Sequence, residues 1–72
     1  MPLNHNGAEI RRRRRELGIK PLEFARRVDL QVSSLNHIEL NSRRPSIEAL
    51  HRIARELGCT VDDVLISDGV SA

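Results

Sequence analysis

Residues that interrupt regular structure recur at short intervals along this chain, and this punctuation constrains its fold more than any other feature. They are Gly7, Gly18, Pro21, Asn41-Ser42, Pro45-Ser46, Gly58 and Gly69. The segments between them are of helix length or shorter, and none shows the sustained alternation of apolar and polar residues that marks a strand. The spacing therefore predicts an all-α fold, with short helices packed around one compact core.

Apolar spacing and end signals together predict five helices. Their expected ranges are 7–17, 21–28, 32–40, 47–57 and 60–66. Asn6 and Ser46 have the side chains of N-caps, and Gly18 and Gly58 follow the first and fourth helices. Thr60 is expected to cap the fifth helix. The expected core-facing stripes are Leu22, Ala25 and Val28 with Phe24 beside them, and Ile47, Leu50, Ile53, Ala54 and Leu57.

The chain is long enough for one domain, predicted at residues 7–66 with flexible termini at 1–6 and 67–72. A domain of this size buries only ~60% of the surface that its unfolded chain exposes, so its core is thin. The single cysteine, Cys59, excludes an internal disulfide and a four-cysteine zinc site. It is expected to pack as a small apolar group, with a redox-sensing thiol as the alternative.

Charge is distributed unevenly along the chain. Residues 1–45 carry ten Lys and Arg against five Asp and Glu, a balance of +5, whereas residues 46–72 have a balance of −3. The positive balance of residues 1–45 suits a polyanionic partner, although these charges can also have no role beyond keeping the protein soluble. The one aromatic residue, Phe24, argues against modules that stack bases on aromatic rings. No apolar run approaches the ~20 residues of a membrane span, and no secretion signal opens the chain, so a cytoplasmic location is expected.

Only three residues, Asp29 to Gln31, separate the second and third predicted helices, as in a helix-turn-helix. The pattern extends over Ile10, Arg14, Leu17-Gly18-Ile19, Leu22-Glu23-Phe24-Ala25, Val28, Leu30, Leu35, Ile38-Glu39, Arg44-Pro45-Ser46, Leu50, Ala54, Leu57-Gly58 and Val64-Leu65. In order and spacing, the stretch from Ile10 to Leu65 resembles the Cro/lambda-repressor-like (XRE-type) family of DNA-binding domains. The resemblance implies a compact five-helix domain with a central helix-turn-helix.

The resemblance also implies that the third helix enters the major groove of double-stranded DNA. Its outward residues, which would face the bases, are Val32, Ser33, Ser34, Asn36 and His37. Asn36 is the natural bidentate partner of adenine, and His37 can donate to guanine. Val32 departs from the polar residue common in the family, and its side chain can instead pack on a thymine methyl. The alternative is that these five residues only form a solvent-exposed face of the helix and contact no DNA.

Contacts to phosphate would supply most of the affinity for DNA. The candidates are Lys20, Gln31, Arg43 and Arg44. Family members often have glutamine at the start of the second helix, where its amide binds phosphate. This chain has Pro21 there, which offers neither a side-chain amide nor a backbone N–H, and Lys20 beside it can substitute.

Five consecutive arginines, Arg11 to Arg15, lie in the first predicted helix and wrap more than one full turn. They cannot all face one partner: Arg11 and Arg15 share a face that can approach phosphates. Arg14 falls where a core-facing residue is expected, and a buried charge needs a partner. The resemblance implies a structural ion pair between Arg14 and Glu39; the alternative is an exposed Arg14 that touches phosphate.

Catalytic and metal-binding patterns are weak, and the protein is not expected to be an enzyme. Ser33 and His37 lie one helical turn apart, but no third group is seen to orient the histidine. His5 falls in the predicted flexible start, and His37 and His51 lie on different helices without a matching cysteine pair. No cofactor, metal or small-molecule ligand is predicted.

The leading hypothesis is a sequence-specific transcriptional regulator, a repressor that binds a two-fold operator as a homodimer. The expected dimer interface is the apolar excess near the C-terminus, at Val61, Val64, Leu65, Ile66 and Val70. The alternative is a protein-interaction module of the same fold, such as an antitoxin that binds a toxin and its own promoter. A cytoplasmic protein that joins the nucleoid when bound to DNA is expected in the leading case, with no membrane partner.

Overall fold

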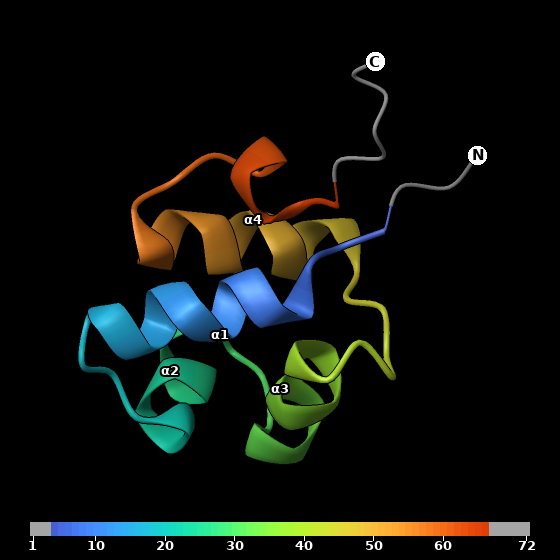
Figure 1. Ribbon diagram of the computed structural model, residues 1–72. Helices are drawn as coiled ribbons and strands as arrows, with labels where there is room; N and C mark the ends of the chain where they lie inside the picture. Colours follow the sequence, from blue (N-terminus) through green and yellow to red (C-terminus); the bar gives the residue numbers. More distant parts are fainter. Residues whose placement is uncertain (1–3, 67–72) are drawn as a thin grey trace.

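The computed structural model describes residues 4–66. Its elements are α1 (Gly7–Glu16), α2 (Pro21–Arg27), α3 (Val32–Glu39), α4 (Ile47–Leu57) and the 3-10 turn η1 (Asp62–Val64). Helix α1 is the central element: it contacts α4 and η1 on one side and α3, which pairs with α2, on the other (Figure 1). The predicted all-α class is confirmed, since the only β pairing among residues 4–66 is an isolated bridge between His5 and Leu65.

The helix ends follow the local sequence signals. The Asn6 side chain accepts a hydrogen bond from the Glu9 amide at the start of α1, and Ser46 accepts one from the Ala49 amide at the start of α4. Both bonds satisfy a backbone donor that has no partner inside the helix. Gly58 ends α4 at a φ of 74°, in the left-handed region that glycine enters without steric cost.

The predicted fifth helix over 60–66 is wrong: only the single 3-10 turn of η1 forms. Thr60 Oγ1 accepts from the Asp63 amide at 3.3 Å and the Thr60 amide donates to Asp63 Oδ2 at 3.0 Å, but the N-cap residue of η1 is Val61, not Thr60. The chain then leaves the helical region because its backbone bonds elsewhere. Leu65 is extended and pairs with His5, and the Ile66 amide donates to the Asn4 carbonyl at 2.9 Å.

The predicted flexible segment at 1–6 needs correction over 4–6, which pack on the domain; residues 1–3 and 67–72 lie outside the described residues. His5 is only 4% exposed, and its Nε2 donates to the Ile38 carbonyl at 2.8 Å. Asn41 closes the contact from the other side: its amide nitrogen donates to the His5 carbonyl, and its Oδ1 accepts from the Gly7 amide. A Cβ at Gly7 would collide with the carbonyl oxygen of Ile38, so this close approach requires glycine.

The core is apolar and draws on every element. Its buried members are Ile10, Phe24, Ala25, Val28, Leu35, Ile38, Leu50, Ile53, Leu57 and Val64. Two predicted core positions are wrong, since Leu22 is 52% exposed and Ile47 is 70% exposed. Leu22 lies about 200° around the helix axis from Phe24, so α2 can bury only one of them fully. The larger side chain, that of Phe24, is the buried one.

Candidate nucleic-acid interface

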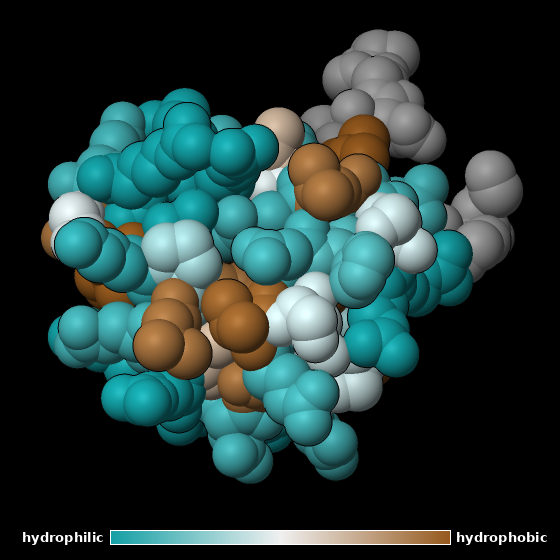
Figure 2. Space-filling view, turned by 90° about the horizontal axis from the view of Figure 1, so that it is seen from below, coloured by the Kyte–Doolittle hydropathy of each residue, from teal (hydrophilic) through white to brown (hydrophobic). Residues whose placement is uncertain are grey.

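Helices α2 and α3 form the helix-turn-helix, joined by a tight turn. Asp29 adopts a φ of 59°, and the Leu30 amide reaches back to the Ala25 carbonyl at 2.8 Å. The left-handed residue reverses the chain within the three residues that separate the helices. Figure 2 views the molecule from the α2 and α3 side, where hydrophilic side chains surround a smaller area of hydrophobic and near-neutral ones.

Three of the predicted base-facing residues, Ser33, Asn36 and His37, are exposed on α3. Leu35 and Ile38 on the opposite side are buried in the core. The outward placement of Val32 needs correction, because its side chain is half-buried and packs against the core cluster. Ser34 is also half-buried. The exposed surface of α3 is therefore narrower and more polar than the sequence suggests.

The loop after α3 is tied to the helix by side-chain contacts. Arg43 Nη1 donates to Ser34 Oγ at 2.9 Å, so the guanidinium lies beside α3. Ser42 Oγ donates to the His37 carbonyl at 3.2 Å and lies 3.1 Å from His37 Nδ1. Sequence reasoning missed Ser42, whose only signal was a serine in a turn. These bonds hold the basic loop and the exposed face of α3 as one surface.

The four predicted phosphate contacts are all exposed. Lys20 and Gln31 are the N-cap residues of α2 and α3, and neither side chain makes a capping bond. Arg43 and Arg44 follow the C-terminal end of α3, where Arg44 Nη2 contacts Asn4 Oδ1 at 3.3 Å. Cationic side chains thus lie beside both the helix-turn-helix start and the loop that follows it.

A buried ion pair fixes α3 against α1. Arg14 Nε donates to Glu39 Oε2 at 2.8 Å and Nη2 donates to Oε1 at 3.1 Å, which is a bidentate arrangement. Arg14 and Glu39 are only 5% and 7% exposed, so the alternative of an exposed Arg14 is wrong. Arg14 Nη1 also donates to the Ile19 carbonyl at 2.9 Å, which links the pair to the turn before α2.

The residues expected at a dimer interface do not form one exposed strip. Val64 is fully buried in the core, so its assignment to an interface is wrong. Val61 and Leu65 are half-buried and pack against the core, whereas Ile66 is 43% exposed. Val70 lies outside the described residues. Val64 ends the single turn of η1 with its side chain buried, and the chain is extended from Leu65 onward.

Other chemistry in residues 4–66 is limited. Cys59 is a free thiol, half-buried against the core, and burial raises its pKa above the usual value, so it stays protonated at neutral pH. Within this range no group of three or more His, Cys, Asp or Glu side chains lies close enough to hold a metal ion. None of the described helices has the length and apolar character needed to cross a membrane.

Comparisons with known proteins agree with this geometry. A family model described as helix-turn-helix matches residues 10–64. An uncharacterized HTH-type transcriptional regulator from Methanothermobacter thermautotrophicus is 38% identical over 60 residues, covering 82% of this chain and 87% of that protein.

Two solved structures are similar in fold. The clp gene regulator ClgR from Corynebacterium glutamicum superposes with a TM-score of 0.75 at 28% identity, over 79% of this chain and 61% of that one. The SinR protein/SinI protein complex has a chain with a TM-score of 0.72 at 32% identity, over 76% of this chain and 54% of that one. The present chain therefore spans less than two thirds of either.

Proposed function

This chain belongs to the XRE-type helix-turn-helix family of transcriptional regulators, and from that premise we propose that it binds double-stranded DNA sequence-specifically as a homodimeric repressor. The observation that carries the proposal is the surface of α3, where Ser33, Asn36 and His37 are exposed. On the buried side of the helix, the ion pair between Glu39 and Arg14 holds α3 against α1. A rigid helix with polar tips can enter the major groove, where each base pair presents a distinct donor and acceptor pattern.

Each exposed side chain of α3 has a proposed role. Asn36 makes bidentate hydrogen bonds to an adenine, His37 donates to guanine acceptors, and the Ser33 hydroxyl adds a less selective contact. Val32 has a minor share because it is half-buried, and Ser34 acts through its bond to Arg43. Lys20, Gln31, Arg43 and Arg44 contact phosphates and set the register of the helix in the groove.

The cationic residues predict a steep salt dependence for binding to random duplex. Three of the proposed phosphate contacts, Lys20, Arg43 and Arg44, are cationic, and each releases a counterion on binding. The slope of log K against log salt is expected to be about −2.7 per chain from these three. Fluorescence anisotropy of a labelled duplex measures it. A flat salt dependence, or no binding at low salt, would contradict the proposal.

A second prediction concerns base reading by Asn36. Once selection from a random pool and footprinting have identified the preferred site, Asn36→Ala is expected to weaken binding to that site by about 1–3 kcal/mol. Binding to random duplex should remain nearly unchanged, because the phosphate contacts are intact. His51→Ala, an exposed change on α4, is the control and should affect neither. Equal losses of affinity for the selected site and for random duplex would mean that Asn36 does not read bases.

Homodimer formation is the part of the proposal that supplies specificity. One helix reads few base pairs, so two copies on half-sites about one helical turn, ~34 Å, apart would double the contacts. The proposed interface centres on the exposed Ile66, with the half-buried Leu65 next to it and Val61 five positions before it. Repression follows because a bound dimer can block polymerase by occupancy. The proposed place of action is the cytoplasm, at the nucleoid.

The second candidate is a protein-interaction module of the same fold, such as an antitoxin that binds a toxin and its own promoter. One observation favours it: a structural relative at 32% identity, the SinR protein, is found in a complex with a second protein. The salt titration separates the proposed function from an interaction module that binds protein alone, since such a module has no reason to bind random duplex.

A further inference from the structure

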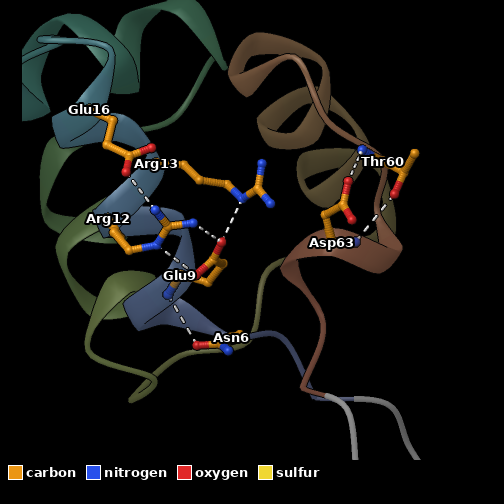
Figure 3. A network of polar contacts seen from close by, with 7 residues as sticks. All are labelled: Asn6, Glu9, Arg12, Arg13, Glu16, Thr60 and Asp63. Atoms are coloured by element: carbon orange, nitrogen blue, oxygen red, sulfur yellow. Dashed lines mark hydrogen bonds and ion pairs between the residues drawn. The ribbon is translucent and has the colours of Figure 1, made fainter.

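The five arginines of α1 are not equivalent, because the middle three form ion pairs with acidic residues. Arg12 bonds Glu9 through two nitrogens and Glu16 through Nη1 at 2.6 Å, and Arg13 Nε bonds Glu9 at 2.7 Å (Figure 3). These bonds, from Arg12 and then Arg13, lower the pKa of Glu9 to about 2, so the carboxylate stays ionised at neutral pH. Arg14 pairs with Glu39 inside the protein.

Arg11 and Arg15 are the two members that remain. Both are exposed, and neither makes an ion pair or a side-chain hydrogen bond with any described residue. They are four positions apart on a helix, so their side chains lie on the same face. Their charges are therefore unneutralised and adjacent.

The surface around this pair connects it to the reading helix. Arg11 and Arg15 line a hollow of about 290 Å³ together with Pro21 at the start of α2 and Asn36 on α3. The other described residues that line it are Leu40 and the ion pair of Arg14 with Glu39, so the one carboxylate among them is already bound by a guanidinium. Asn36 is the exposed residue proposed to read adenine, so the two cations lie beside the groove-facing surface and not behind it. Pro21 supplies no backbone N–H to this hollow, so its donors are side chains, and the cationic ones without an acidic partner among the described residues are Arg11 and Arg15.

We propose that Arg11 and Arg15 form a second phosphate-binding site, the α1 phosphate site, which holds the DNA backbone next to the base pairs read by α3. The inference rests on the proposed function, since its occupant is the same duplex. Charge complementarity supports it: the site has two unpaired guanidinium groups, which suit phosphate geometry. Continuity supports it as well, because Asn36 belongs to both surfaces. Its guanidinium groups place phosphate donors beside the start of α2, where Pro21 has no backbone N–H.

The arginine run provides its own matched control. Arg11→Gln with Arg15→Gln removes two unpaired charges, whereas Arg12→Gln with Arg13→Gln removes two charges already bound by Glu9 and Glu16. Both double variants change the net charge equally. The first is expected to make the salt slope shallower by about 1.8 and to weaken random-duplex binding about 60-fold at 0.1 M salt. The second should alter the slope by less than about 0.5.

Three outcomes distinguish the possibilities, with far-UV circular dichroism to verify that each variant is folded. Equal losses in the two double variants would overturn the α1 phosphate site and leave only a net-charge effect. Unchanged duplex binding in both would overturn it too, while the proposed function stands. No salt-dependent binding by the unmodified protein would overturn both proposals.

A position-specific measurement provides a second check. Ethylation of individual phosphates interferes with binding wherever the protein contacts them. The unmodified protein should show an interference position beside the half-site that disappears in the Arg11→Gln, Arg15→Gln variant and persists in the Arg12→Gln, Arg13→Gln variant. An unchanged interference pattern would contradict the α1 phosphate site.

Discussion

Arg14→Met is expected to lower the free energy of unfolding by about 3–5 kcal/mol, the usual cost of removing one partner of a buried ion pair. The methionine keeps most of the aliphatic volume but leaves the Glu39 carboxylate buried without its bidentate donor. The Ile19 carbonyl loses a donor as well. Because a domain of this size has only about 5–15 kcal/mol of stability, the variant should be largely unfolded in mild denaturant.

The control for this prediction is Arg12→Met, in the same run of arginines. Arg12 is also paired, but its side chain is 53% exposed, so the loss should be within about 1 kcal/mol. The chain has no Trp or Tyr, so urea unfolding is followed by far-UV circular dichroism. Arg14→Met combined with Glu39→Leu should recover most of the loss, because the uncompensated charge is gone. A loss from Arg14→Met no larger than that from Arg12→Met would contradict the structural role of the pair.

Phe24→Ala is the second large effect, with an expected loss of about 3–5 kcal/mol in the free energy of unfolding. Phe24 is fully buried and is the largest of the fully buried side chains. Truncation removes its transfer free energy and leaves a cavity that a thin core cannot refill. The same urea titration measures the loss.

Leu22→Ala, two positions away on α2, is the matched control. Apolar periodicity places Leu22 on the core-facing stripe, but its side chain is half-exposed. Its truncation should therefore cost within about 0.5 kcal/mol. Similar losses for Phe24→Ala and Leu22→Ala would mean that α2 is rotated about its axis from its position here, and α3 would then be presented differently.

Arg14→Met and Phe24→Ala also bear on function, because α3 depends on the rest of the domain for its stability. It is a helix of eight residues, too short to be stable alone in water, and it depends on the core and on Glu39 for its position. Loss of the Arg14–Glu39 pair should therefore reduce duplex binding through the folded population. The α1 phosphate site differs in this respect, since Arg11→Gln and Arg15→Gln remove contacts without touching the core.

Much of the secondary structure follows from local signals, and sequence predicts it well. Four of the five helices lie within one residue of the expected ranges, because caps and glycine ends act over three or four residues. The shared face of Arg11 and Arg15 also follows from helical spacing, whereas their lack of acidic partners among the described residues is known from the structure. The Arg14–Glu39 pair was available only through resemblance to a family, since 25 positions separate its members.

Sequence by itself determined the all-α class, the helix-turn-helix spacing and the identity of the polar side chains on α3. Only the tertiary structure decided how the two ends of the domain meet. The N-terminal residues bond to distant parts of the chain in three places: the His5 ring donates to the Ile38 carbonyl, the Gly7 amide donates to Asn41 Oδ1, and the Asn6 amide donates to the Val64 carbonyl. The physical reason is that local hydrogen bonds and capping choose each helix independently. A short end segment, by contrast, adopts whichever conformation satisfies its backbone groups against distant parts of the chain.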